Sequence, residues 1–151
     1  MSADPDDLAE QLDAVVLALF RTTTADRAQL SLTAAAVLAR LQRGGPARLT
    51  ELATGEGITQ PSMTTLVARL VAQGLVDRAG DPTDRRAVVL TLTPAGAELL
   101  ARRRADRTGR LAPHLAGLSS DERDRIAAAL PALTQLAGAV RRPRTPAEVT
   151  R

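Results

Sequence analysis

The sequence predicts a mainly α-helical protein that carries one β-hairpin. The chain has 151 residues and is 44% hydrophobic, and its apolar residues are mostly Ala and Leu, which are strong helix formers. Phe20 is the single aromatic residue, so the core must be filled by aliphatic side chains, as in helices packed on helices. Only the stretch after Gly74 replaces the helical pattern by strand-like runs. The length fits one domain, or one domain with dimerisation arms.

Two helices are expected in the first third of the chain. Apolar residues recur three and four positions apart from about Asp4 to Thr24, and again from about Thr33 to Arg43. The second helix should stop at residues 44–46, Gly-Gly-Pro. In the second helix Val37, Leu38 and Leu41 are expected to face inward. The recurring apolar residues of the first helix are Leu8, Leu12, Val15, Val16, Leu19 and Phe20.

Two shorter helices should follow. Thr50 is expected to cap a helix that ends near Gly55 or Gly57, and Thr59 to cap a helix that runs to about Gln73. On a helical wheel this last helix has an apolar arc and, opposite it, a small, flat and polar face. The apolar arc holds Met63, Leu66, Val67, Leu70 and Val71, and the polar face Pro61, Ser62, Thr65, Ala68, Arg69 and Ala72. Met63 is therefore expected in the core.

A β-hairpin and two more helices complete the expected order. Residues 75–78 and 87–93 favour strands, and the charged, turn-rich residues 80–86 between them predict a basic hairpin tip. Thr93 followed by Pro94 starts a helix to about Ala112. The last helix is expected to begin at a capping box in residues 119–122, to run to about Val140 and to bend at Pro131. Residues 141–151 are expected to be a disordered tail.

The composition argues against several classes of protein. The chain has no Cys and one His, which leaves no disulfide, no thiolate zinc site and no catalytic triad. It also lacks a glycine-rich phosphate loop. We therefore expect neither an enzyme nor a cofactor or metal site. No apolar run could span a bilayer, and the acidic start does not resemble a signal peptide, so the expected location is the cytoplasm, with no membrane partner.

Positive charge gathers in the middle of the chain. Residues 40–110 contain twelve Arg and seven acidic residues, whereas residues 1–39 contain two Arg and six acidic residues. A basic middle segment favours a polyanion as its partner. The densest run, residues 102–104 with Arg107 and Arg110, circles its helix, which favours a solvated or dimer-rim role over DNA contact.

Helix, turn, helix and hairpin between Leu49 and Thr93 are the parts of a winged helix-turn-helix. A helix of about 10–12 Å diameter fits the major groove of B-DNA. Small side chains such as Ser62, Thr64 and Thr65 allow the helix to approach the bases closely. An Arg at a hairpin tip can enter the adjacent minor groove, where the negative potential is high.

The order of motifs resembles the MarR family of bacterial regulators. The resemblance covers about residues 31 to 100 and rests on five segments, and the flanking helices fit the family's dimerisation arms by order and length. The segments are residues 45–53 (GPARLTELA), 58–70 (ITQPSMTTLVARL), 74–78 (GLVDR), 81–86 (DPTDRR) and 90–96 (LTLTPAG).

The resemblance implies a mainly α winged helix-turn-helix homodimer that represses transcription from a palindromic operator. Residues 1–30 and 94–140 would dimerise, and residues 31–93 would bind double-stranded DNA. Release by a small-molecule effector would follow the family, although the residues that bind it are not indicated.

The same resemblance suggests how individual residues contact DNA. Arg86 would enter the minor groove, oriented by Asp84 through a charge-assisted hydrogen bond, and Arg85 would face phosphate. The major-groove residues would be Ser62, Thr64, Thr65 and Arg69, with Gln60 as a further candidate. Thr65 stands where many members of the family have a basic residue.

One alternative stays open at this point, a winged helix that binds another protein. The polar helix face argues against it, because protein interfaces favour buried aromatic anchors. Salt dependence distinguishes the two, since only phosphate contacts weaken steeply with salt.

Overall fold

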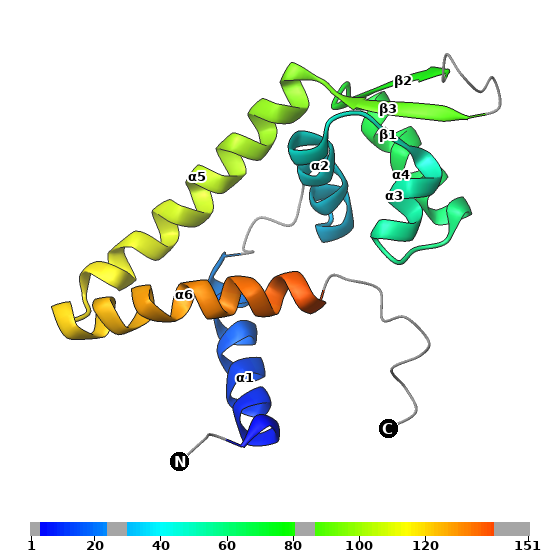
Figure 1. Ribbon diagram of the computed structural model, residues 1–151. Helices are drawn as coiled ribbons and strands as arrows, with labels where there is room; N and C mark the ends of the chain where they lie inside the picture. The colour runs from blue at the N-terminus through cyan, green and yellow to red at the C-terminus, as the bar shows by residue number, and fades with distance from the viewer. Residues whose placement is uncertain (1–3, 24–29, 81–86, 141–151) are drawn as a thin grey trace.

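The computed structural model describes residues 4–23, 30–80 and 87–140, and Figure 1 shows their arrangement. Within these ranges the chain forms helices and one small antiparallel sheet, which confirms the mainly α fold and the expected order of elements. The helices are α1 (Pro5–Thr23), α2 (Leu32–Gly44), α3 (Leu49–Gly55), α4 (Gln60–Ala72), α5 (Pro94–Ala116) and α6 (Ser120–Val140), and the strands β1 (Ala47–Arg48), β2 (Val76–Gly80) and β3 (Val88–Leu92). The expected tail, residues 141–151, lies outside the described residues.

The sheet has a third strand that the sequence pattern did not predict. The strand order is β1-β3-β2, and β1 pairs with β3 at Ala47↔Leu90 and Arg48↔Val89. A strand of two residues carries no alternation of apolar and polar side chains, so only its pairing with β3 reveals it. The expected hairpin of β2 and β3 is present, paired from Val76↔Leu92 to Gly80↔Val88.

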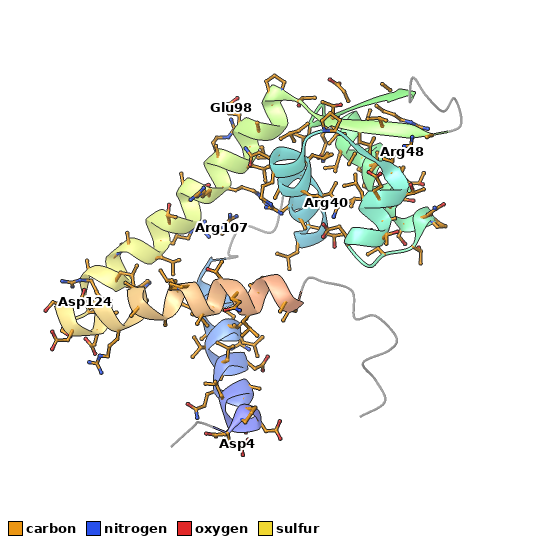
Figure 2. All side chains as sticks on the ribbon, viewed as in Figure 1. Asp4, Arg40, Arg48, Glu98, Arg107 and Asp124 are labelled. Atoms are coloured by element: carbon orange, nitrogen blue, oxygen red, sulfur yellow. The ribbon has the colours of Figure 1, made fainter. Side chains whose placement is uncertain are left out.

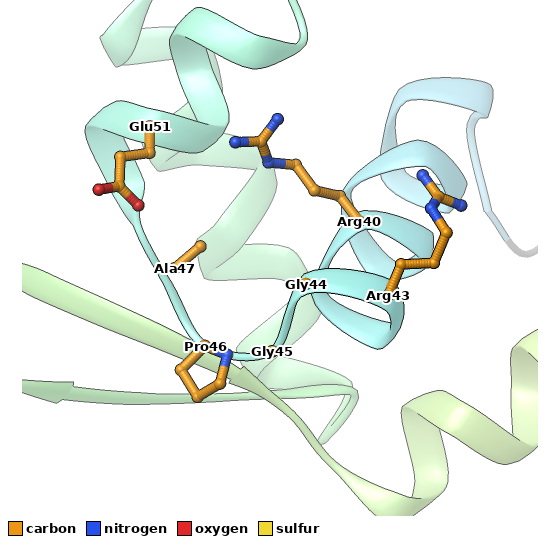
Figure 3. A pocket seen from close by; sticks show the side chains of 7 residues that line it. All are labelled: Arg40, Arg43, Gly44, Gly45, Pro46, Ala47 and Glu51. Carbon is orange, nitrogen blue, oxygen red and sulfur yellow. The ribbon is translucent and has the colours of Figure 1, made fainter. Parts of the chain in front are cut away.

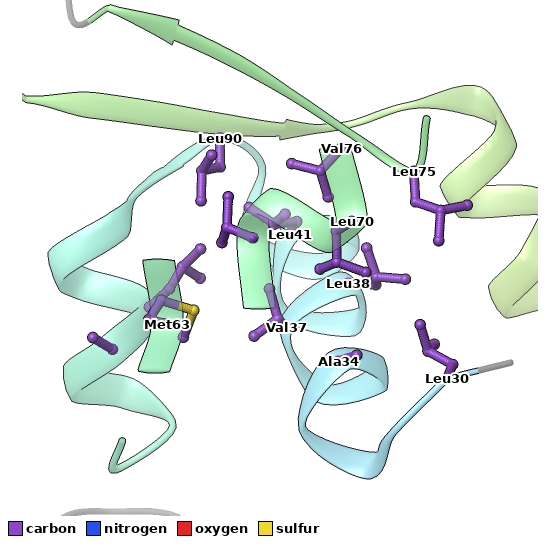
Figure 4. Packing of buried hydrophobic residues seen from close by; sticks show 13 residues of the cluster. Leu30, Ala34, Val37, Leu38, Leu41, Met63, Leu70, Leu75, Val76 and Leu90 are labelled. Carbon is purple, nitrogen blue, oxygen red and sulfur yellow. The ribbon is translucent and has the colours of Figure 1, made fainter. Parts of the chain in front are cut away.

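One aliphatic core holds α2, α3, α4 and the sheet together as a lobe (Figure 4). Met63 is fully buried in this core, as predicted. Val71, which was expected to face inward, is exposed, because it lies in the last turn of α4 at the edge of the apolar arc. The core residues are Leu30, Ala34, Val37, Leu38, Leu41, Leu52, Ala53, Met63, Val67, Leu70, Leu75, Val76 and Leu90.

Two helix starts differ from the expected ones. Helix α2 begins one residue before Thr33, because the Ser31 hydroxyl accepts a hydrogen bond from the Ala34 N–H at 3.2 Å. Helix α3 begins before Thr50, so the predicted cap was wrong. Its start is closed instead by the Glu51 carboxylate, which accepts from the Arg48 N–H at 3.1 Å.

The later helices follow the predicted caps. The Thr59 hydroxyl accepts from the Ser62 N–H at 3.4 Å, and α4 is followed by Gly74 at φ 69°, a backbone conformation that favours glycine. Helix α5 extends beyond the expected end at Ala112 and contains Pro113. A proline in the last turn removes only one intrahelical bond.

Helices α1, α5 and α6 lie outside the lobe (Figure 1). Helix α5 leaves the sheet as an arm, α6 returns from the far end of that arm, and α1 contacts α5. Glu98 lies near the lobe and Asp124 at the far end of the arm (Figure 2). Helix α6 begins at the predicted capping box and continues through Pro131. Among the described residues, every helix is too short or too polar to cross a bilayer.

Candidate nucleic-acid interface

The outer face of α4 holds the side chains that were predicted to enter the major groove. Helix α4 packs one face into the lobe core, so the opposite face is left to solvent. Along that face, residues three and four positions apart form one continuous stripe from the first turn to the last. The predicted residues Gln60, Ser62, Thr64, Thr65 and Arg69 are all exposed on α4.

The threonine hydroxyls on this face have a defined orientation. Thr64 Oγ1 donates to the Gln60 carbonyl at 2.9 Å, and Thr65 Oγ1 donates to the Pro61 carbonyl at 3.1 Å. Because each hydroxyl proton is used within the helix, each oxygen offers its lone pairs outward, together with the side-chain methyl group. Acceptor lone pairs match the amino groups of adenine and cytosine in the major groove, and methyl groups match that of thymine.

The first turn of α4 is already occupied by its own cap. Thr59 Oγ1 donates to Ser62 Oγ at 2.9 Å while accepting from the Ser62 N–H, and Pro61 brings no N–H group. The Gln60 side chain is therefore the polar group at the start of α4 that this cap leaves available for DNA. Its amide can both donate and accept, which suits an adenine edge.

The stalk of the wing is formed by β2 and β3. The two strands stay paired as far as Gly80↔Val88, and the segment that joins them carries Asp84, Arg85 and Arg86. These three predicted DNA-contacting residues lie outside the described residues.

Two arginines of the dense run on α5 have partners within the chain. Arg102 forms an exposed ion pair with Glu98 at 2.7 Å, and Arg103 Nη1 donates to the Leu30 carbonyl at 3.3 Å. Arg107 lies on the arm, away from α4 (Figure 2). These placements do not bring the run to the α4 face.

A hollow of about 390 Å³ lies between the end of α2 and the start of α3 (Figure 3). The Arg40 side chain extends toward α3, whereas Arg43 points away from it. Arg40 packs against Gly55 so closely that an added Cβ would lie 2.3 Å from its Nη1, and Glu51 closes the start of α3. Arg40 thus packs α2 against the end of α3, and Glu51 acts within the start of α3. The hollow is lined by Arg40, Arg43, Gly44, Gly45, Pro46, Ala47 and Glu51.

Sequence reasoning missed a contact between the end of α4 and the start of α5. Thr93 was expected only as a helix cap. Its hydroxyl accepts from the Gly96 N–H at 3.0 Å, as a cap does, and also donates to the Gly74 carbonyl at 2.7 Å. The Thr-x-x-Gly spacing after β3 was the signal available in the sequence.

A helix-turn-helix whose second helix exposes a flat polar face, followed by a paired wing, defines a winged helix-turn-helix DNA-binding protein. The model of the MarR family matches residues 30–88. An HTH-type transcriptional regulator of Mycobacterium leprae is 35% identical over 119 residues, which cover 78% of this chain and 83% of that protein. The chain belongs to the MarR family of transcriptional regulators, as its sequence motifs predicted.

Other relatives match shorter regions. An HTH-type transcriptional regulator of Mycobacterium bovis is 39% identical over 95 residues, covering 63% of this chain and 66% of its own length. The transcriptional repressor NicR of Pseudomonas putida is 36% identical over 83 residues, covering 55% of this chain and 52% of its own length. These relatives are named as transcription regulators and not as enzymes.

Solved structures share the fold over most of the chain. RV1404 from Mycobacterium tuberculosis superimposes with a TM-score of 0.77 at 24% identity, covering 89% of this chain and 95% of that one. A transcriptional regulator from Pseudomonas aeruginosa gives 0.71 at 32% identity, covering 87% and 91%. Bordetella bronchiseptica BpsR, solved in a study of how 6-hydroxynicotinic acid regulates its DNA binding, gives 0.58 at 27% identity, covering 89% and 95%.

Proposed function

We propose that this MarR-family regulator is a homodimeric repressor that binds a palindromic operator and is released by a small-molecule effector. The observation that carries the proposal is the exposed, small and polar face of α4 beside the paired stalk of the wing. Residues 31–93 would bind DNA, and residues 1–30 and 94–140 would dimerise.

Uncovered apolar side chains on the arms support the homodimer. All of α6 is exposed in the single chain, although apolar residues recur along one stripe of it. Leu8, Val15 and Leu19 are about half exposed on α1. A second copy of the same arms would cover both helices and supply the apolar burial that one chain lacks. The exposed stripe on α6 includes Ile126, Leu130, Leu133 and Val140.

A two-fold dimer would present α4 twice to one face of DNA. Half-sites about one helical turn apart would then receive one copy each, so the operator would share the two-fold symmetry of the protein. Gln60, Ser62, Thr64, Thr65 and Arg69 would face base edges and nearby phosphates, as the resemblance implies. At the wing, Arg86 would enter the minor groove, with Asp84 orienting it and Arg85 on phosphate.

Two relatives support repression and release. NicR is named a repressor, and the BpsR structure concerns regulation of DNA binding by 6-hydroxynicotinic acid. The rival reading, a protein-binding winged helix, is disfavoured by the α4 face, which offers no aromatic anchor.

The test is binding of the purified protein to the intergenic DNA upstream of its own gene, beside an unrelated fragment, at about 50 and 200 mM salt. We expect a two-fold footprint on the first fragment, and steep weakening with salt. Arg86→Ala should weaken this binding by about 1–3 kcal/mol, and the arm variant Arg104→Ala, which also removes one charge, should weaken it less. Equal losses in the two variants would contradict the wing contact, and equal binding to both fragments would contradict operator recognition.

A further inference from the structure

We infer that Thr93 and Gly96 form a latch that fixes the angle between α5 and the DNA-binding lobe, and thereby sets the half-site spacing that the protein accepts. The inference rests on the proposed homodimer with two half-sites. It assigns a specificity role to residues that lie away from the α4 face.

Thr93 connects the two elements by hydrogen bonds at a buried position. The residue is 9% exposed. Its hydroxyl donates to the Gly74 carbonyl at 2.7 Å and accepts from the Gly96 N–H at 3.0 Å, and its own N–H donates to the Leu75 carbonyl at 3.2 Å. Gly74 directly follows the C-cap of α4. The Thr93 side chain thus joins the end of α4 to the first turn of α5.

Gly96 allows the helix backbone to lie directly on the lobe. An added Cβ would lie 2.3 Å from the Leu75 carbonyl oxygen and 2.7 Å from Leu92 Cδ1. The first of these atoms belongs to the backbone and cannot rotate away. A side chain at this position would therefore require α5 to move away from Leu75.

The same face of α5 continues the contact for two turns. Leu99 and Leu100 pack against the core, and Arg103 Nη1 donates to the Leu30 carbonyl at 3.3 Å. Leu30 and Leu75 lie on the α5 side of the cluster (Figure 4). Residues 96, 99, 100 and 103 share one helix face, so the first turns of α5 are packed against the lobe along that face. Beyond Arg103 most α5 side chains are exposed.

The length of α5 makes this angle matter. A helix of 23 residues is about 35 Å long. A tilt of about 5° at the latch would displace its far end by about 3 Å, close to the roughly 3.4 Å rise of one base pair. If the latch holds the angle fixed, the dimer binds only a narrow range of half-site spacings tightly. If the angle varies, half-sites one base pair closer together or further apart would also be bound.

The first experiment measures spacing discrimination on a DNA site that the wild type selects from a random library. One base pair is then inserted or removed between the half-sites. We expect each change to weaken wild-type binding by about tenfold or more. Thr93→Val keeps the shape but loses the hydroxyl, so its affinities for the three spacings should lie within about threefold of one another. Thr93→Ser should restore discrimination.

A matched pair of glycine variants tests the close approach. Gly96→Ala should lose the wild-type preference or move it to another spacing. Gly109→Ala lies in the same helix, where an added Cβ meets nothing within 4 Å, and should keep the wild-type preference.

A DNA-free measurement separates the latch from the homodimer. The chain has no Cys, so Ala72→Cys permits one nitroxide on each α4. The Ala72→Cys protein should give one narrow distance in the dimer. Adding Thr93→Val to it should give a broad distribution, and adding Thr93→Ser a narrow one. A folded, dimeric Thr93→Val with wild-type distances and wild-type spacing discrimination would overturn the latch. Absence of dipolar coupling in the Ala72→Cys protein with Thr93 intact would instead overturn the homodimer on which the latch rests.

Discussion

At the scale of single residues, Met63 shows how one turn of α4 separates structural from DNA-facing roles. Its side chain is fully buried in the lobe core, whereas Thr64 beside it is exposed. A thioether on an unbranched chain fills irregular space, which is useful in a protein whose only aromatic residue, Phe20, lies outside this core. The packing of Met63 therefore fixes the direction in which its neighbours point.

Met63→Ala is expected to destabilise the protein by about 2–5 kcal/mol, because it removes buried methylene groups and leaves a cavity. Chemical denaturation followed by circular dichroism, at one fixed protein concentration, measures this change. Thr64→Ala is the matched surface control and should change stability by no more than about 0.5 kcal/mol. Equal effects from the two substitutions would contradict the core position of Met63.

At the scale of elements, α6 depends on the capping box at its start. The Ser119 hydroxyl donates to Glu122 Oε2 at 2.7 Å and the Ser119 N–H donates at 2.9 Å. These two hydrogen bonds, the side-chain one foremost, lower the pKa of Glu122. The charged carboxylate is therefore the form that supports the helix start. Its contribution is present at neutral pH and is lost as the pH falls through the lowered pKa.

Ser119→Ala should raise the pKa of Glu122 toward the ordinary glutamate value, because the side-chain donor is removed and only the backbone donor remains. A pH titration of the Glu122 carboxyl carbon by NMR reads the change directly. Ser120→Ala, next to it, should leave that titration where it is. An unchanged pKa in Ser119→Ala would show that the capping box does not form in solution.

At the scale of the whole molecule, a well-packed lobe is joined to arms that bury little. The core residues belong to the lobe and to the segments beside it, whereas α6 is exposed throughout. The free energy that orders the arms must then come from a contact outside the single chain. The proposed second copy supplies it, so folding of the arms and dimerisation should occur together.

Leu130→Glu should raise the dissociation constant of the dimer by about 100-fold or more, because it places a charge in the apolar stripe of α6. Gln135→Glu introduces the same charge on the opposite face of the helix and should leave the dimer intact. Sedimentation equilibrium over a range of protein concentrations measures both. A Leu130→Glu variant that dimerises like the wild type would exclude this stripe from the interface.

Sequence patterns within single helices and strands predicted most of the fold. Contacts between segments far apart in the sequence could not be predicted from such patterns. Thr59 and Thr93 marked helix starts because a cap is chemistry within one turn. Strand β1 exists only through its pairing with β3, and the bond from Thr93 to Gly74 joins residues nineteen positions apart. The helical wheel placed Ser62, Thr65 and Arg69 on the face opposite the core. It could not show that Thr64 and Thr65 direct their hydroxyl protons into the helix.

The contacts between the lobe and α5 also define where two such regulators could be recombined. Every bond described at this junction lies between Leu30 and Arg103. A hybrid that takes residues 30–103 from one parent and the flanking segments, α1 included, from the other would keep the lobe–α5 angle of the first parent and take its dimerisation partner from the second. A hybrid joined at Thr93 would instead divide this junction between two parents. The angle between its lobe and α5 would then be inherited from neither.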